Sequence, residues 1–137
     1  IVSEEVEKAR PLLAGKPVEM TLSVEASPHL FAPPSVLAMV VRNLVQNACN
    51  FTEKGSILVQ VEADGVVVRD TGIGMSAETL QHVYDPFFRA DAFSPLGKGF
   101  GLTIASRLAR RFRWQLKLDS IERQGTVATL RFTPGAA

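Results

Sequence analysis

The chain has 137 residues, the length of a single domain with one hydrophobic core. Hydrophobic residues make up 46% of it and charged residues 21%, and this composition excludes a disordered tail. The formal net charge is +1, so no basic field favours a nucleic-acid partner. Cys49 is the only cysteine, which excludes a disulfide within the chain and fits a reducing compartment.

The first residues predict the end of a helix and then a strand. Residues 2–13 are charged and loosely periodic, and we expect a helix that enters the domain. Because the chain opens on Ile1 without an initiator methionine, we expect it to be a piece of a longer protein. No apolar run approaches the roughly 20 residues that span a membrane. Residues 18–25 alternate between apolar and polar side chains, which predicts a half-buried strand.

Residues 35–52 have a helical period and follow a loop with three prolines at residues 27–34. Asn43, Asn47 and Asn50 lie within about 60° of one another on this helix, at the border of its apolar stripe. The helical wheel places Cys49 away from that stripe. The stripe itself should face the core and consists of Leu37, Val41, Leu44, Ala48 and Phe51.

The second half of the chain predicts two hairpins and two helices. The first hairpin turns at Asp64–Gly65 and the second at Gln124–Gly125. Residues 85–99 have no regular period, and their length favours a functional lid. The expected strands are residues 57–63, 66–70, 114–118 and 127–132, and the expected helices are residues 76–84 and 100–112. The fold class is therefore α+β, a two-layer α/β sandwich in which a mixed, mostly antiparallel sheet of about five strands packs on three helices.

The three asparagines suggest a metal site. Asparagine is a poor helix-interior residue, so three on one border suggest a functional requirement. Neutral amide oxygens can coordinate Mg²⁺ without repelling a triphosphate. The alternative is that the three side chains are half-buried surface groups bonded to water or loops.

Asp70 ends an apolar strand, and Gly72 and Gly74 free the backbone beside it. A carboxylate there can accept a hydrogen bond from an exocyclic amine such as that of adenine. The alternatives are a simple turn aspartate and a retroviral-type aspartic protease, which also carries Asp-Thr-Gly. Ile73 after the triplet and the long helix at residues 35–52 disfavour the protease.

A glycine-rich run at residues 97–102 leads into a helix, whose unpaired N–H groups can bind phosphate. It is neither a Walker loop nor a convincing dinucleotide fingerprint. Arg89 and Lys98 can meet a γ-phosphate, or can be solvated cations. The arginines at the end of the last helix, Arg107, Arg110, Arg111 and Arg113, are interpreted mainly as a solvated face.

Taken in order, these segments resemble the catalytic ATP-binding domain of sensor histidine kinases, in the Bergerat-fold ATPase superfamily. Residues 42–48, 70–75, 84–89 and 97–102 carry the resemblance, which extends over residues 18–133. It implies ATP and Mg²⁺ as cofactors, with Asn47 as the main metal ligand, Asn43 beside it and Asp70 as the adenine anchor. It also implies nucleotide contacts from Asn50, Gly72, Gly74, Phe87, Phe88, Gly97, Lys98, Gly99, Phe100, Gly101, Leu102 and Thr126.

Two residues and one absence depart from the family pattern. Asn50 stands where a basic residue is common, which removes one phosphate contact. Pro86 replaces an arginine of one branch and matches another branch. The phosphoacceptor histidine is not in this chain, and we expect it upstream of Ile1.

The resemblance implies a histidine kinase domain at residues 17–134, after the end of a helix or linker at residues 1–16. It would donate the γ-phosphate of ATP to a histidine on a helical dimerisation domain of the same kinase, with a response regulator downstream. We expect a monomeric cytoplasmic domain, without a nucleic-acid partner, in a protein that can be anchored in the inner membrane. The alternative is a nucleotide-gated binding module without phosphotransfer; because residues 35–51 contain no Glu, self-contained hydrolysis is disfavoured.

Overall fold

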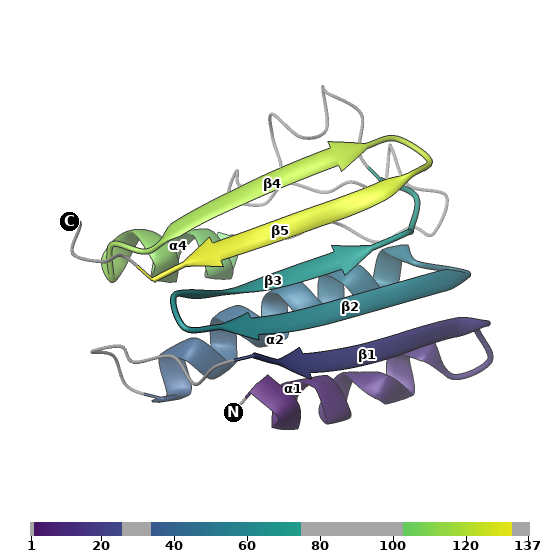
Figure 1. The fold of residues 1–137 in the computed structure, drawn as a ribbon, viewed down its shortest axis with the longest axis horizontal. Coiled ribbons are helices and arrows are strands. Elements are labelled where there is room, and N and C mark those ends of the chain that lie inside the picture. The colour runs from purple at the N-terminus through teal and green to yellow at the C-terminus, as the bar shows by residue number, and fades with distance from the viewer. Residues whose placement is uncertain (1, 26–33, 75–102, 133–137) are drawn as a thin grey trace.

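The computed structural model describes residues 2–25, 34–74 and 103–132, which form one layer of strands and one of helices (Figure 1). The helical elements are α1 (Val2–Ala9), the 3-10 helix η1 (Arg10–Leu13), α2 (Pro34–Phe51) and α4 (Thr103–Arg111). The strands are β1 (Val18–Val24), β2 (Gly55–Glu62), β3 (Gly65–Asp70), β4 (Gln115–Ile121) and β5 (Gly125–Arg131). This confirms the expected α+β sandwich.

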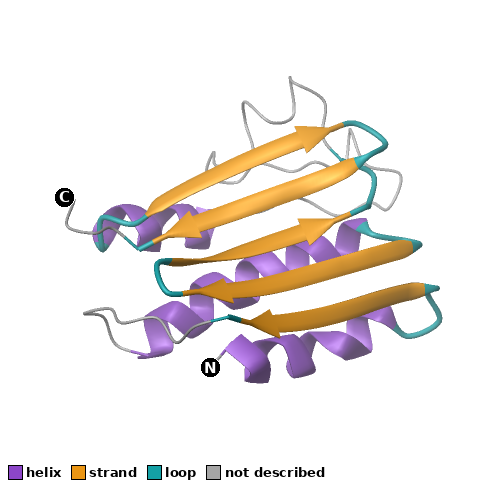
Figure 2. Cartoon of the chain, in the orientation of Figure 1, coloured by secondary structure: helices purple, strands orange, loops and turns teal. Residues whose placement is uncertain are grey.

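The five strands form one mixed sheet in the order β1-β2-β3-β5-β4. β1 runs parallel to β2, and every other neighbouring pair is antiparallel. Figure 2 shows α2 lying across one face of the sheet, with α1 beside the β1 edge and α4 near β4 and β5. None of the described helices is long and apolar enough to cross a membrane.

The apolar stripe of α2 faces the core as expected. Its five predicted members are at most 5% exposed, and each fully buried aliphatic side chain contributes about 1.5–3 kcal/mol. The prediction for Cys49 was wrong, because this residue is fully buried and its Sγ lies 3.9 Å from the Sδ of Met20. The reason is that α1 and β1 cover a second side of α2, where Val40 and Val45 are also buried.

The incoming helix belongs to the same core. Val2, Val6 and Ala9 of α1 are buried with the residues of α2. Glu5, only 3% exposed, accepts a hydrogen bond from Arg42 Nε of α2 at 2.8 Å. The Arg42 guanidinium lowers the pKa of Glu5 against the opposing effect of burial. An ion pair therefore joins α1 to the helix that carries the asparagines.

The β2–β3 hairpin turns one residue earlier than expected. Gly65 pairs with Glu62, so the turn consists of Ala63 and Asp64. Gly65 also lies opposite Arg131 of β5, and a Cβ atom on it would collide with the carbonyl oxygen of Leu130. A glycine is thus required by the close approach of β5.

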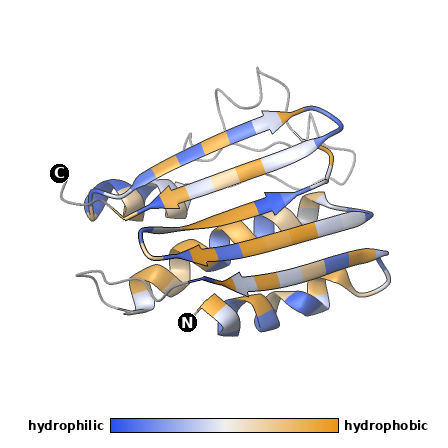
Figure 3. Cartoon of the chain, viewed as in Figure 1, coloured by the Kyte–Doolittle hydropathy of each residue, from blue (hydrophilic) through white to orange (hydrophobic). Residues whose placement is uncertain are grey.

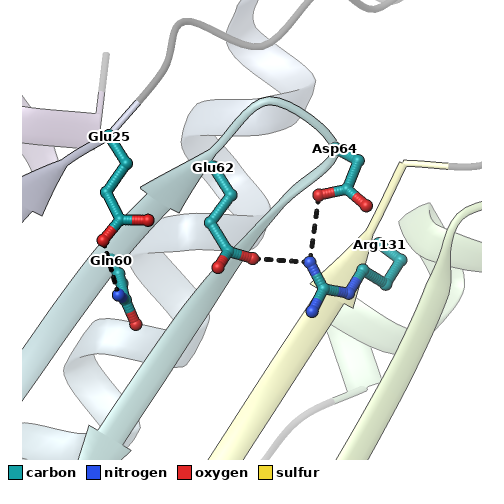
Figure 4. A network of polar contacts seen from close by, with 5 residues as sticks. All are labelled: Glu25, Gln60, Glu62, Asp64 and Arg131. Atoms are coloured by element: carbon teal, nitrogen blue, oxygen red, sulfur yellow. Dashed lines mark hydrogen bonds and ion pairs between the residues drawn. The ribbon is translucent and has the colours of Figure 1, made fainter.

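A network of polar contacts closes this end of the sheet (Figure 4). Nη1 of Arg131 lies 2.6 Å from Glu62 Oε1 and 3.1 Å from Asp64 Oδ1. Because Gly65 between them has no side chain, the guanidinium can reach across β3 to β2. Gln60 of β2 donates to Glu25, the residue directly after the neighbouring strand β1, at 3.0 Å. The carboxylates at this end are therefore matched by a cation or an amide.

The remaining predicted elements differ in how far the structure describes them. The expected strands at residues 114–118 and 127–132 correspond to β4 and β5, and Trp114 packs against Phe112 and Phe132 with ring centroids 5.6 and 5.2 Å apart. The expected helix at residues 76–84, the lid at residues 85–99 and residues 27–33 of the proline-rich loop lie outside the described residues, whereas Pro34 begins α2.

Candidate functional site

Asp70 is the last residue of β3 and lies on the face of the sheet that α2 covers. Side chains two residues apart on a strand point to the same face, so Asp70 shares its face with Val68 and Val66, which are buried in the core. Its Oδ1 accepts a hydrogen bond from the Gly72 N–H at 2.9 Å. Burial raises the pKa of this half-buried carboxyl to about 6, although the backbone N–H groups of Gly72 and Thr126 act in the opposite direction. Within the described ranges no lysine or arginine forms an ion pair with it.

Thr126 of β5 lies opposite Asp70 in the strand register. It is 7% exposed, and its hydroxyl lies 2.8 Å from that of Ser120, which donates to the Gly125 carbonyl. Gly125 has a φ of 128°, and a Cβ atom on it would collide with the Asp70 carbonyl oxygen. This glycine lets β5 approach β3 closely enough to place a buried hydroxyl beside the carboxylate.

The turn after Asp70 packs against the end of α2. Ile73 N donates to the Phe51 carbonyl at 3.0 Å, and a Cβ atom on Gly72 would collide with that same carbonyl. Gly74 has a φ of 66°, a backbone region that favours glycine. These glycines were predicted to free the backbone for a ligand. In the structure they also bring the turn against α2 and against the β4–β5 turn.

A buried hydroxyl beside this turn has no hydrogen-bond partner within the described part of the chain. Thr52 is fully buried, and its Oγ1 would lie 2.8 Å from a Cβ atom on Gly72. A buried polar group without a partner is costly, and its presence calls for an explanation. It is the kind of group that a ligand or an ordered water can satisfy.

The asparagine border of α2 lies on the same side of the sheet as Asp70. The Phe51–Ile73 hydrogen bond joins the end of α2 to the turn after Asp70. The charge of Asp70 also raises the pKa of Cys49, whose thiol is shifted to about 11 mainly by burial. Asn47 is half-buried and lies one helical turn before Phe51. The structure therefore brings the carboxylate and this amide to one face.

Asn43 has a role that the sequence did not indicate. Its Oδ1 accepts a hydrogen bond from the N–H of Ala105 at 3.0 Å, in the first turn of α4. The first N–H groups of a helix lack intrahelical partners, so this amide oxygen satisfies one of them. Met39, Arg42, Asn43 and Gln46 line a shallow cavity of about 90 Å³ on the outer surface of α2. No local sequence signal could have found a contact between residues 62 positions apart.

The other predicted site residues lie outside the description. The backbone of Asn50 belongs to α2, but its side chain is not described. Outside the described ranges are also Phe87, Phe88, Arg89, Gly97, Lys98, Gly99, Phe100, Gly101 and Leu102. Their roles stay predictions. Next to the described part of the site, a cavity of about 290 Å³ is lined by Glu53, Lys54, Thr71, Gly72, Ile73 and Arg123.

The described part of the chain is thus an α+β domain, in which a mixed sheet has helices on one face and a carboxylate at the end of its central strand β3. The family of histidine kinase-, DNA gyrase B- and HSP90-like ATPases matches residues 33–136, and the chain belongs to this family.

The similar proteins are sensor kinases. The chain is 32% identical to the sensor protein QseC of Escherichia coli O157:H7 over 109 residues, covering 79% of this chain and 24% of that protein. It is 35% identical to the sensor histidine kinase RcsC of Escherichia coli K12 over 105 residues, covering 72% of this chain and 11% of that protein. The chain thus spans a quarter or less of the length of these relatives.

Solved structures have the same fold. Full-length ShkA in complex with AMPPNP superposes with a TM-score of 0.80 at 25% identity, covering 94% of this chain and 28% of that one. The mycobacterial sensor histidine kinase MprB superposes with a TM-score of 0.71 at 21% identity, covering 93% of this chain and 91% of that one. The chain is therefore a histidine kinase-like ATPase domain of the kind found in sensor kinases.

Proposed function

We propose that this chain binds ATP and Mg²⁺ and donates the γ-phosphate to a histidine on a separate helical domain of the same kinase. The observation that carries the proposal is the Asp70 carboxylate, which is half-buried, lacks a cation among the described residues and faces α2. A half-buried carboxylate with a raised pKa and without a cation among the described residues is a candidate to accept a hydrogen bond from a ligand. The relatives that are sensor kinases support the same function.

The described residues fit the base of ATP. The Asp70 carboxylate can accept a hydrogen bond from the exocyclic amine of adenine, a charged hydrogen bond worth about 1.5–3 kcal/mol. Thr126 lies opposite Asp70 in the strand register and has a buried hydroxyl, and we propose that this hydroxyl shares a water with the base. The Thr52 hydroxyl, which has no hydrogen-bond partner among the described residues, lies against the turn after Asp70. These three polar groups, all near the end of β3, are our candidates for contacting the purine.

The α2 border fits a magnesium ion that is shared with phosphates. Bound Mg²⁺ neutralises part of the triphosphate charge and takes oxygen ligands. Asn47 is our main candidate ligand, because this residue is half-buried on the helix that covers the same side of the sheet as Asp70. Asn43 Oδ1 already accepts the Ala105 N–H at 3.0 Å, and this hydrogen bond competes with metal binding. We assign Asn43 chiefly to positioning the start of α4.

The phosphates would meet residues outside the description. We keep the aromatic box at residues 84–89 and the glycine box at residues 97–102 as the predicted lid and phosphate-binding segments. Phosphoryl transfer depends on positioning and charge neutralisation more than on a protein nucleophile, which suits a domain without an assigned base. We further propose residues 17–134 as the catalytic domain, a cytoplasmic location and a response regulator downstream.

The proposal is tested by mixing the chain with a histidine-bearing helical domain from the longer protein and ATP labelled at the γ-phosphate. Label on the histidine, lost when that histidine is replaced by glutamine, is the expected result. Omission of Mg²⁺ should abolish transfer. Tight nucleotide binding without transfer would contradict the kinase and support a nucleotide-gated binding module.

A further inference from the structure

The end of α4 carries a concentrated positive charge. Four exposed arginines lie within seven residues, and we call them the basic patch: Arg107, Arg110, Arg111 and Arg113. Figure 3 shows the hydrophilic colour of this helix beside the β4 end of the sheet. No carboxylate in the described part of the chain forms an ion pair with any of them, whereas Arg42 and Arg131 are both paired.

The patch is unfavourable within the helix itself. Arg107 lies three residues before Arg110 and four before Arg111, and these spacings put like charges next to one another on one face. The negative end of the helix dipole compensates cations in the last turn only in part. Among the described residues, therefore, no carboxylate offsets the repulsion between these arginines.

Arg113 adds an independent observation. The helix ends in a Schellman motif, in which Trp114 N donates to Ala109 O at 2.7 Å and Arg113 N donates to Arg110 O at 3.2 Å. Arg113 occupies the left-handed position of this motif with a φ of 61°, where glycine is favoured. An arginine at this position is strained, and strained residues cluster at functional sites.

A cavity adjoins the patch. It has a volume of about 300 Å³, lies between α4 and β4, and is lined by Ser106, Ala109, Arg110, Trp114 and Leu116. Trp114 and Leu116 provide apolar surface, and Arg110 is exposed. β4 is the last strand in the sheet order, so its outer edge has no strand partner among the described residues. The cavity is large enough for one aromatic or aliphatic side chain.

We propose that the basic patch docks an acidic segment of a partner protein, with one apolar side chain of that segment in the adjoining cavity. Charge complementarity identifies the acidic partner, and the apolar wall of the cavity identifies the anchoring side chain. A nucleic acid or an anionic membrane fits less well. The patch spans about 9 Å along the helix, too short to follow a phosphate backbone, and a flat lipid surface would leave the cavity empty. This surface is distinct from the proposed nucleotide site.

The test uses a fluorescent peptide of twelve residues, made of Asp and Glu with one central Phe, without nucleotide and at about 0.1 M salt. We expect a Kd of about 10–100 µM for the unaltered chain. Arg110→Glu should weaken binding about tenfold or more. The matched control is Arg69→Glu, an equal charge change at an exposed residue of β3, which should alter Kd by less than about twofold.

Two further measurements separate docking from a structural role. Arg113→Gly should raise the midpoint of thermal unfolding by about 2–4 °C, because it relieves the backbone strain, and should weaken peptide binding several-fold. A peptide with Ser in place of Phe should bind about fivefold or more weakly. The proposal is overturned if the unaltered chain does not bind the peptide, or if Arg69→Glu and Arg110→Glu weaken peptide binding by the same factor. It is also overturned if a DNA duplex or anionic vesicles bind more tightly than the peptide.

Discussion

The two ends of β3 both carry an aspartate, and the protein treats them in opposite ways. At the hairpin end, Asp64 and Glu62 share the guanidinium of Arg131, and all three side chains contact water. At the other end, Asp70 is half-buried, and its described hydrogen-bond donors are backbone N–H groups, without a cation. Both ends also use a glycine where a Cβ atom would collide with a neighbouring carbonyl, namely Gly65 and Gly72.

We interpret the charges at the hairpin end as structural, and we propose that Asp70 at the other end belongs to a binding site. The Glu62–Arg131–Asp64 network is complete, so no ligand is needed to explain it. Among the described groups, Asp70 has no cation beside it and the Thr52 hydroxyl has no hydrogen-bond partner. Burial of these two groups costs free energy that a bound ligand can offset. The pattern agrees with a binding site at one end of the strand and a closing network at the other.

The largest expected effect is on stability and comes from Asp70→Asn. The unfolded carboxyl titrates near pH 4 and the folded one near pH 6, so between these values the folded state holds a proton that the unfolded state has lost. The free energy of unfolding should therefore fall as the pH rises from 4 to 6. At pH 7.5 the variant should be more stable than the unaltered chain by about 2–3 kcal/mol in urea unfolding, with the gain shrinking towards pH 4.5. A variant less stable than the unaltered chain at pH 7.5 would contradict this.

The next largest effect is on nucleotide affinity. Asp70→Ala should weaken ATP binding about ten- to a hundredfold, because the variant loses the charged hydrogen bond to the base. Titration calorimetry measures it at pH 7.5. Asp64→Ala, at the other end of β3, is the matched control and should leave the affinity within about twofold. Equal affinities for the Asp70 variant and the unaltered chain would remove the adenine assignment.

Thr52→Val tests the Asp70 end of β3 without changing the carboxylate itself. The substitution keeps the shape of the side chain and removes the buried hydroxyl that has no described partner. We expect the free energy of unfolding to rise by about 1 kcal/mol in the absence of nucleotide, measured by urea denaturation. A loss of stability would mean that the hydroxyl is already satisfied in the free domain.

The smallest effect is expected from Arg131→Ala at the complete end. The guanidinium and the two carboxylates are partly exposed, so water screens their attraction, and we expect a loss of about 0.5–1 kcal/mol. The loss should shrink in 1 M salt, and ATP affinity should not change. A weakened ATP affinity would show that the two ends are coupled through β3.

Local sequence patterns predicted the elements well where their cause is local. The stripe of α2 and the alternation of residues 18–25 each depend on neighbours a few residues away. The prediction for Cys49 failed because one helix wheel does not show that a second layer, α1 with β1, covers another side of α2. The hairpin turn shifted by one residue because Gly65 is needed against β5 and not in the turn itself.

The sequence by itself determined that this chain builds an α+β sandwich with a carboxylate at a strand end and amides on a helix border. Only the tertiary structure decided that Asp70 is buried without a described cation, that Thr126 lies opposite it and that Asn43 supports the start of α4. The physical reason is sequence separation. Periodicity records what each residue does within its own element, whereas burial, register and pKa depend on which distant strands and helices the folded chain brings together.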